Sequence, residues 1–224
     1  MHNWLVKKFI KDYENTGDIN VRAAYGKLSG KVGIFCNAFL FLGKFIVGTV
    51  SGSVSITADA VNNLSDAASS IISLIGFKMA EKPADADHPY GHARYEYLSG
   101  LTVAVMIILI GVELFKSSLD KVLNPSPVDF SAAAAVVLIG SIVVKLWMSL
   151  FNRALGKKIN SATLEATSAD SRNDVISTSA VLIAALITHF AKIDLDGYMG
   201  VAVAVFILYS GIGLVKDTLD PLLG

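Results

Sequence analysis

The 224-residue sequence is poor in charge and in cysteine, and each shortage excludes a class of protein. Only 17% of the residues are charged, well below the average of about 25% in soluble domains. The net charge is zero, so nothing in the charge balance suggests a nucleic-acid partner, and none is expected. The single cysteine, Cys36, cannot form an intrachain disulfide.

Apolar residues make up 53% of the chain and come in long blocks, with a mean hydropathy of +0.57. About 20 apolar residues in a helix can cross a bilayer. Six spans are predicted, at about 32–51, 54–79, 96–117, 130–152, 161–188 and 197–215. The second and fifth have polar middles. The predicted fold is all-α, a six-helix transmembrane bundle within a transport domain of residues 31–218.

The first 30 residues lack the unbroken apolar stretch of a signal peptide. Trp4 and Phe9 alternate with Lys7, Lys8 and Lys11, which predicts an amphipathic helix on the membrane surface. The alternative is a solvated leader without a role. Lysine and arginine gather before the first span and in the links after the second and fourth spans. This distribution predicts a multi-pass protein of the cell membrane with both termini in the cytoplasm.

Polar side chains in the second and fifth spans recur every three or four residues, which places them on one face of each helix. The second span carries Ser55, Asp59, Asn62, Asp66 and Ser69, and the fifth carries Thr163, Thr167, Asp170, Asp174 and Ser177. These stripes are expected to face a polar site rather than lipid.

Two pairs lie at matching depths in these stripes. Asn62 and Asp66, like Asp170 and Asp174, lie roughly 12–20 Å from one membrane surface at 1.5 Å per residue. Each buried carboxylate costs at least ~2.5 kcal/mol. Arg172 points about 200° away from each aspartate on its helix, so it is a poor counter-charge. A divalent cation from outside, held by these four oxygen donors, is the prediction. The alternative is a hydrogen-bonded core that only locks helix packing.

Three other intramembrane residues are charged, and each needs a role or a partner. Asp59 either guides ions near the external side or serves packing. Lys44 is too deep to reach a surface and is expected to pair with an acid across a helix gap. Lys145 is expected to extend its ammonium to the cytoplasmic surface.

The stretches "ADAVNNLSDAASS" (58–70), "KPADADHPYGHARYEYLSG" (82–100) and "SADSRND" (168–174) resemble the cation diffusion facilitator family of metal–proton antiporters. The resemblance covers nearly the whole chain. It implies a transport site made of Asn62, Asp66, Asp170 and Asp174, the four residues that the stripes had indicated. It also implies a homodimer.

Some relatives bind a second metal in the loop after the second span. The matching residues are Asp85, His88 and His92, a tentative loop site. The alternative is a folded hinge shaped by Pro89 and Gly91. Family members normally continue into a cytoplasmic domain after the sixth span. Residues 219–224 are interpreted as the start of that missing domain, whose absence would weaken the dimer.

The predicted substrate is Mn²⁺. Zinc favours nitrogen or sulfur ligands, and zinc transporters of the family have a histidine among the four site residues. Here all four offer oxygen, which suits Mn²⁺ and resembles the manganese-type branch. A broad exporter of Zn²⁺ or Fe²⁺, with Co²⁺ and Cd²⁺ as further substrates, is the alternative. No permanently bound cofactor is expected.

Crowded carboxylates cannot all stay ionised without the metal, so the empty site is expected to return carrying protons. The predicted function is therefore metal efflux by proton antiport, not enzymatic catalysis. An intramembrane aspartyl hydrolase would leave Asn62 without a role. A structural or regulatory subunit is the other alternative, and metal-dependent stabilisation separates it from a transporter.

Overall fold

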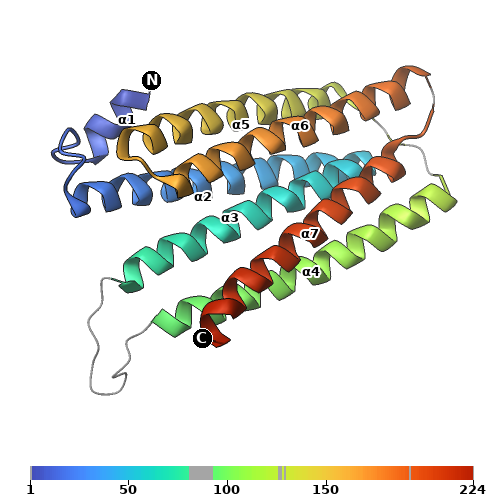
Figure 1. Ribbon diagram of the computed structural model, residues 1–224. Coiled ribbons are helices and arrows are strands. Elements are labelled where there is room, and N and C mark those ends of the chain that lie inside the picture. Colours follow the sequence, from blue (N-terminus) through green and yellow to red (C-terminus); the bar gives the residue numbers. More distant parts are fainter. Residues whose placement is uncertain (1, 81–92, 126–127, 129, 192, 224) are drawn as a thin grey trace.

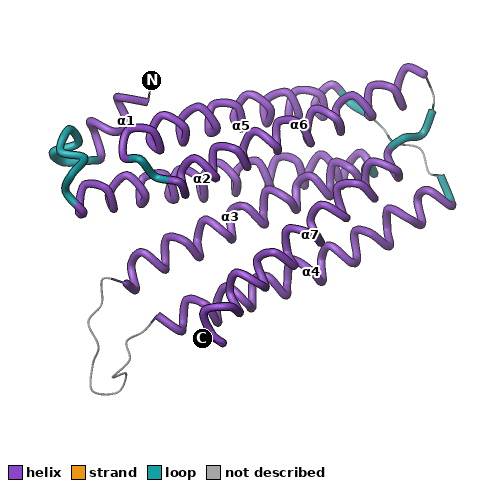
Figure 2. The backbone as a smooth tube through the Cα atoms, in the orientation of Figure 1, coloured by secondary structure: helices purple, strands orange, loops and turns teal. Residues whose placement is uncertain are grey.

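The computed structural model of the protein describes residues 2–80, 93–125, 128, 130–191 and 193–223. All regular structure in these residues is helical, as the sequence predicted (Figure 2). The helices are α1 (His2–Phe9), α2 (Ile19–Ser51), α3 (Val54–Ala80), α4 (Ala93–Leu123), α5 (Ala132–Ile159), α6 (Ala162–Ala191) and α7 (Asp196–Leu223). The fold is a six-helix bundle, α2 to α7, preceded by one short helix.

The six long helices pack as three close pairs, α2 with α3, α5 with α6, and α4 with α7. Figure 1 shows the α5–α6 pair along one side of the bundle and the α4–α7 pair along the other, with α3 between them. Helix α3 also contacts α4, α6 and α7. Its polar stripe therefore lies inside the bundle, where helices on several sides can supply partners.

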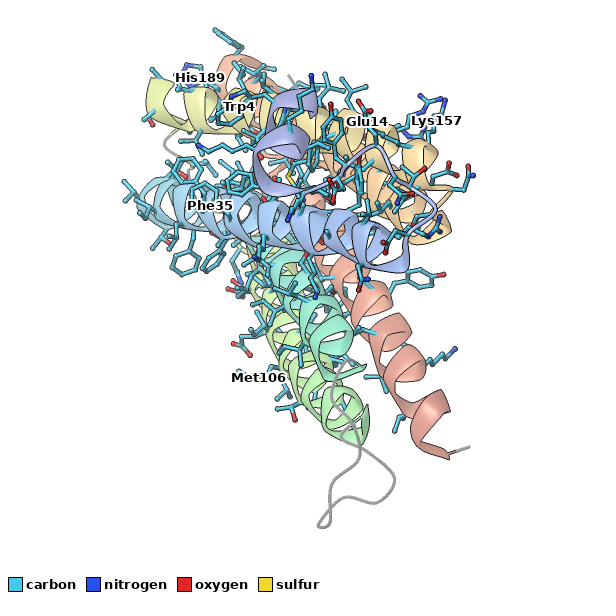
Figure 3. The ribbon with its side chains drawn as sticks, turned by 90° about the vertical axis from the view of Figure 1, so that its left-hand side faces the viewer. Trp4, Glu14, Phe35, Met106, Lys157 and His189 are labelled. Atoms are coloured by element: carbon cyan, nitrogen blue, oxygen red, sulfur yellow. The ribbon has the colours of Figure 1, made fainter. Side chains whose placement is uncertain are left out.

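Four helices meet the length and hydropathy of a membrane span over their described residues, namely Asn20–Ser51, Ala132–Ile159, Leu164–Ala191 and Asp196–Lys216. Helices α3 and α4, with 27 and 31 residues, are also long enough to cross. Large apolar side chains cover the outside of the bundle. Phe35 and Met106, both more than half exposed, point outward in Figure 3. Such a surface fits lipid rather than water.

Helix α1 is amphipathic, as predicted. Val6 is buried, and Ile10, the residue that follows the helix, is buried with it against the apolar cluster that contains Tyr25 and Phe151. Trp4 and Phe9, in contrast, are about 60% exposed. The inner side thus fixes the helix to the end of the bundle, and the aromatic outer side is free to contact a membrane surface.

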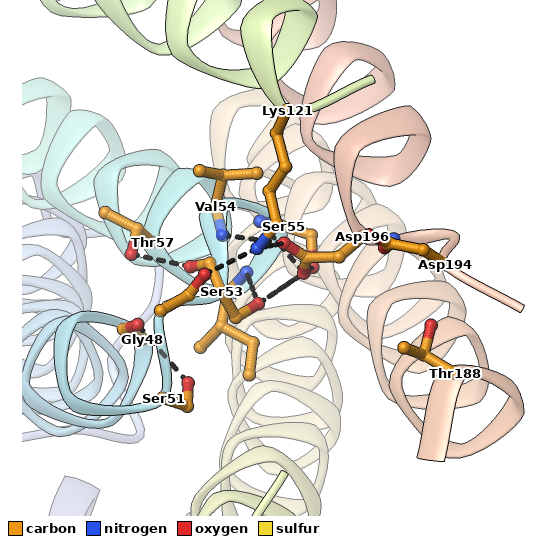
Figure 4. Close-up of polar contacts among 12 residues, drawn as sticks. Gly48, Ser51, Ser53, Val54, Ser55, Thr57, Lys121, Thr188, Asp194 and Asp196 are labelled. Atoms are coloured by element: carbon orange, nitrogen blue, oxygen red, sulfur yellow. Dashed lines mark hydrogen bonds and ion pairs between the residues drawn. The ribbon is translucent and has the colours of Figure 1, made fainter. Parts of the chain in front are cut away.

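The opposite end of the bundle is tied together by Asp196, the first residue of α7 (Figure 4). Its carboxylate accepts hydrogen bonds from the Val54 amide at 2.9 Å and from the hydroxyls of Ser53 and Ser55. It also pairs with Lys121 near the end of α4, at 2.9 Å. One carboxylate therefore joins the α2–α3 turn to α4 and α7.

Candidate metal centre

Helices α3 and α6 bring the two predicted polar pairs together. Asp66, Asp170 and Asp174 each offer a carboxylate oxygen, and these three oxygens lie within 4.8 Å of one another. Asn62 donates its side-chain amide to Asp174 Oδ1 at 2.8 Å. Residues more than 100 positions apart in the sequence thus meet at one point, because each helix turns its four-residue-spaced pair inward.

Lys145 of α5 provides a cation at this point, contrary to the sequence prediction. Its ammonium pairs with Asp66 Oδ2 at 2.7 Å and with Asp174 Oδ2 at 2.6 Å. Only 1% of the side chain is exposed, so Lys145 does not extend to the membrane surface. The two carboxylates compensate the charge of the buried ammonium.

A signal in the sequence could have indicated this role. The buried face of α5 carries a polar stripe of its own, Ser141, Lys145, Ser149 and Asn152. Besides Lys145, two members of the stripe contact neighbouring helices: Ser149 donates to the Ser168 carbonyl at 2.8 Å, and Asn152 accepts from Ser29 at 2.7 Å. The spacing of four, four and three places Lys145 on an inward face. Arg172, in contrast, is exposed, which agrees with the prediction that it is a poor counter-charge for the two aspartates.

A cavity of about 660 Å³ leads to the carboxylates from one end of the bundle. It is lined by residues from the start of α2, such as Arg22, and from the α5–α6 turn, such as Ser161. Asp66, Asp170 and Lys145 also line it. Asp170 is exposed, Asp66 is half-buried and Asp174 is buried, so the three carboxylates form a graded path from the cavity into the core.

On the other side of the carboxylates, a second buried ion pair joins α2 to α3. Lys44 Nζ of α2 lies 2.7 Å from Asp59 Oδ2 of α3, and both side chains are at most 1% exposed. The Thr178 hydroxyl of α6 donates to the same carboxylate at 3.0 Å, and Lys44 donates to Thr178 at 3.0 Å. Lys44 therefore pairs with an acid across a helix gap, as predicted, and Asp59 is that acid.

The chemistry of the cluster suits a hard divalent cation. With all four groups ionised, three carboxylates and one ammonium leave a formal charge of −2. Oxygen ligands favour Mn²⁺, Mg²⁺ and Ca²⁺ over softer ions. No other group of three acidic, histidine or cysteine side chains at metal-binding distance occurs among the described residues. Asp85, His88 and His92 lie outside the described residues.

The chain is similar in sequence to known cation-efflux proteins. Residues 30–223 match the model of the cation efflux transmembrane domain. An uncharacterized transporter of Methanocaldococcus jannaschii is 34% identical over 188 residues, 84% of this chain. The manganese efflux system protein MneS of Bacillus subtilis and the cation-efflux pump FieF of Klebsiella pneumoniae are each 27% identical, over 78% and 89% of this chain.

The matches cover 66%, 60% and 68% of these relatives' own lengths, so the chain spans about two thirds of the proteins it matches. The family match covers most of the chain, including every residue of the carboxylate cluster and its lysine. It describes a transport domain rather than an enzyme. The chain belongs to the cation efflux family, that of the cation diffusion facilitators.

Proposed function

We propose that the protein exports a divalent metal cation across a membrane, with Asn62, Asp66, Asp170 and Asp174 as the transport site. The observation that carries the proposal is the convergence of three carboxylates, within 4.8 Å of one another, at the inner end of a cavity. Charge so deep in a membrane domain is costly, and a transported cation gives it a function. Two relatives named for cation or manganese efflux support this reading.

Mn²⁺ is the proposed main substrate. The four proposed ligands are three carboxylates and an amide, a set without the nitrogen or sulfur that zinc favours. Zn²⁺ or Fe²⁺ export is the alternative, since affinity alone does not exclude zinc from an oxygen site. Asp85, His88 and His92 remain a proposed second, shallow metal site in the loop between α3 and α4.

Protons are the proposed counter-ion. Without a metal, a single ammonium pairs with two of the three carboxylates, and protons carried on the return path would relieve the excess negative charge. The cavity opens at the end of the bundle that contains the N-terminus and most of the lysines and arginines. We place this end in the cytoplasm by the positive-inside rule, with both termini there.

Access to the site would then alternate between the two sides. In the conformation described here the cytoplasmic cavity is open, while the Lys44–Asp59 pair and the Asp196 cluster close the external side. Outward opening would require α3 to separate from these partners, and the bound load would determine which state is favoured. A homodimer in the cell membrane is the proposed assembly.

The test is transport by the purified chain in proteoliposomes that contain a pH-sensitive dye. Mn²⁺ is expected to move with protons flowing in the opposite direction, and Asp174→Ala is expected to abolish both movements. Lys157→Met, a change at an exposed residue near the end of α5, serves as the matched control. Transport of Zn²⁺ without Mn²⁺ would overturn the metal assignment, and metal transport without proton flow would overturn antiport.

A further inference from the structure

Lys145 holds the same oxygen atoms that a metal ion would need. Its ammonium bonds to Asp66 Oδ2 and Asp174 Oδ2, while the Asn62 amide group bonds to Asp174 Oδ1. Both oxygens of Asp174 are therefore engaged. A divalent ion that binds Asp174 would compete with these donors for the lone pairs of the carboxylate, and it would repel the ammonium at the same time.

The bundle offers the displaced ammonium another place. Asn37 of α2 lines the cavity that Lys145 also lines. Its side chain is 3% exposed, and its Oδ1 atom has no hydrogen-bond partner among the described residues. A buried, unpaired carbonyl oxygen is costly unless it finds a donor. A lysine side chain is flexible, and this one lines the same cavity as Asn37, so the cavity is the route by which its ammonium would reach Asn37 Oδ1.

We propose that Lys145 is a tethered cation of the transport site, which competes with the metal for Asp66 and Asp174 and moves to Asn37 Oδ1 when the metal binds. The ammonium keeps its charge throughout and moves as a group. The inference rests on the proposed function and assigns Lys145 a role in affinity and turnover rather than in ligation. Asn37 is the positioning residue for the displaced state.

Two consequences follow for the transport cycle. Competition weakens metal binding, so that the ion can leave on the far side instead of remaining trapped among three carboxylates. After release, the ammonium returns to Asp66 and Asp174 and restores part of the charge balance of the empty site. A transporter without Lys145 should therefore bind its metal more tightly and move it more slowly.

The test is calorimetric titration of the purified chain with Mn²⁺ at one fixed pH, followed by transport in proteoliposomes. Lys145→Met keeps an unbranched side chain that is one atom shorter, and it removes the charge. It is expected to bind Mn²⁺ about tenfold more tightly or more, because the metal no longer competes with a buried ion pair. Its maximal transport rate is expected to fall. Lys157→Met is the control and should change neither quantity.

Asn37→Ala provides a second, independent variant. It removes the acceptor for the displaced ammonium, so Mn²⁺ binding should weaken by about threefold to tenfold, the value of one hydrogen bond. In the Lys145→Met background the same change should have no effect. If Lys145→Met does not fold, Asn37→Ala alone decides, and unchanged affinity in that variant overturns the proposal.

Failure of this inference differs from failure of the proposed function. If wild-type protein binds Mn²⁺ and loses it in Asp174→Ala, but Lys145→Met binds with unchanged or weaker affinity, the site stands and the competition is wrong. If wild-type protein binds neither Mn²⁺ nor Zn²⁺, the proposed function itself fails.

Discussion

Removing one partner of the buried Lys44–Asp59 ion pair should lower the free energy of unfolding much more than removing both partners together. The nitrogen and oxygen lie 2.7 Å apart with at most 1% of either side chain exposed. We expect Lys44→Met to destabilise the bundle by about 3–5 kcal/mol, because Asp59 would remain as an uncompensated buried charge. The Thr178 hydroxyl, 3.0 Å from Asp59, can stabilise that charge only in part.

The double variant Lys44→Met/Asp59→Val should recover most of this loss. The two apolar side chains are close in size to the ones they replace and remove both charges together, and such replacements of buried ion pairs are often close to neutral. Thr178 would then bond to a carbonyl of its own helix, as threonine hydroxyls do in apolar surroundings. The single variant therefore measures the cost in stability of an unpaired buried charge, and the double variant measures the net contribution of the ion pair to stability.

Thermal unfolding in detergent micelles gives the measurement. A loss of 3–5 kcal/mol should lower the Tm by roughly 6–20 °C for a chain of this size. Lys116→Met, at an exposed lysine of α4, is the matched control and should leave the Tm unchanged. If Lys44→Met unfolds at the wild-type temperature, or if the double variant is less stable than the single one, the reasoning about this pair is refuted.

Two further predictions concern the metal and the helix contacts. Added Mn²⁺ should raise the Tm of the wild type and should not raise that of Asp174→Ala. At a Mn²⁺ concentration of a hundred times its Kd, the expected gain in the free energy of unfolding of the wild type is about 2.7 kcal/mol. Equal shifts of the Tm in both proteins would mean that Mn²⁺ binds elsewhere. Gly48→Ala should lower the Tm, because the new Cβ would lie 2.6 Å from Thr57 Oγ1 and 2.8 Å from the Thr57 amide nitrogen, and α2 would have to move away from α3. An unchanged Tm in that variant would mean that the two helices do not approach so closely.

Much of the fold and of the carboxylate cluster was predictable because both depend on patterns within single helices. Apolar runs gave six long helices, and the four-residue spacing of Asn62 and Asp66, and of Asp170 and Asp174, gave their inward faces. Antiparallel helices at matching depth then bring the pairs together. Each of these steps uses only the distance along one helix.

The partners of the two buried lysines depend on distances between helices. Lys145 lies 29 residues from Asp174 and 79 from Asp66, and neither spacing says that α5 packs where it can reach both. Lys44 was expected to find an acid, but only the contact between α2 and α3 identifies Asp59. The sequence alone therefore indicated a counter-charge from outside the protein, although Lys145 already supplies one.

The most direct test of the central claim is anomalous diffraction from crystals of the protein grown with Mn²⁺. We expect one manganese peak among the carboxylates of Asp66, Asp170 and Asp174, with the Lys145 ammonium no longer bonded to Asp66. A manganese peak elsewhere in the bundle, with Lys145 still paired to both aspartates, would contradict it.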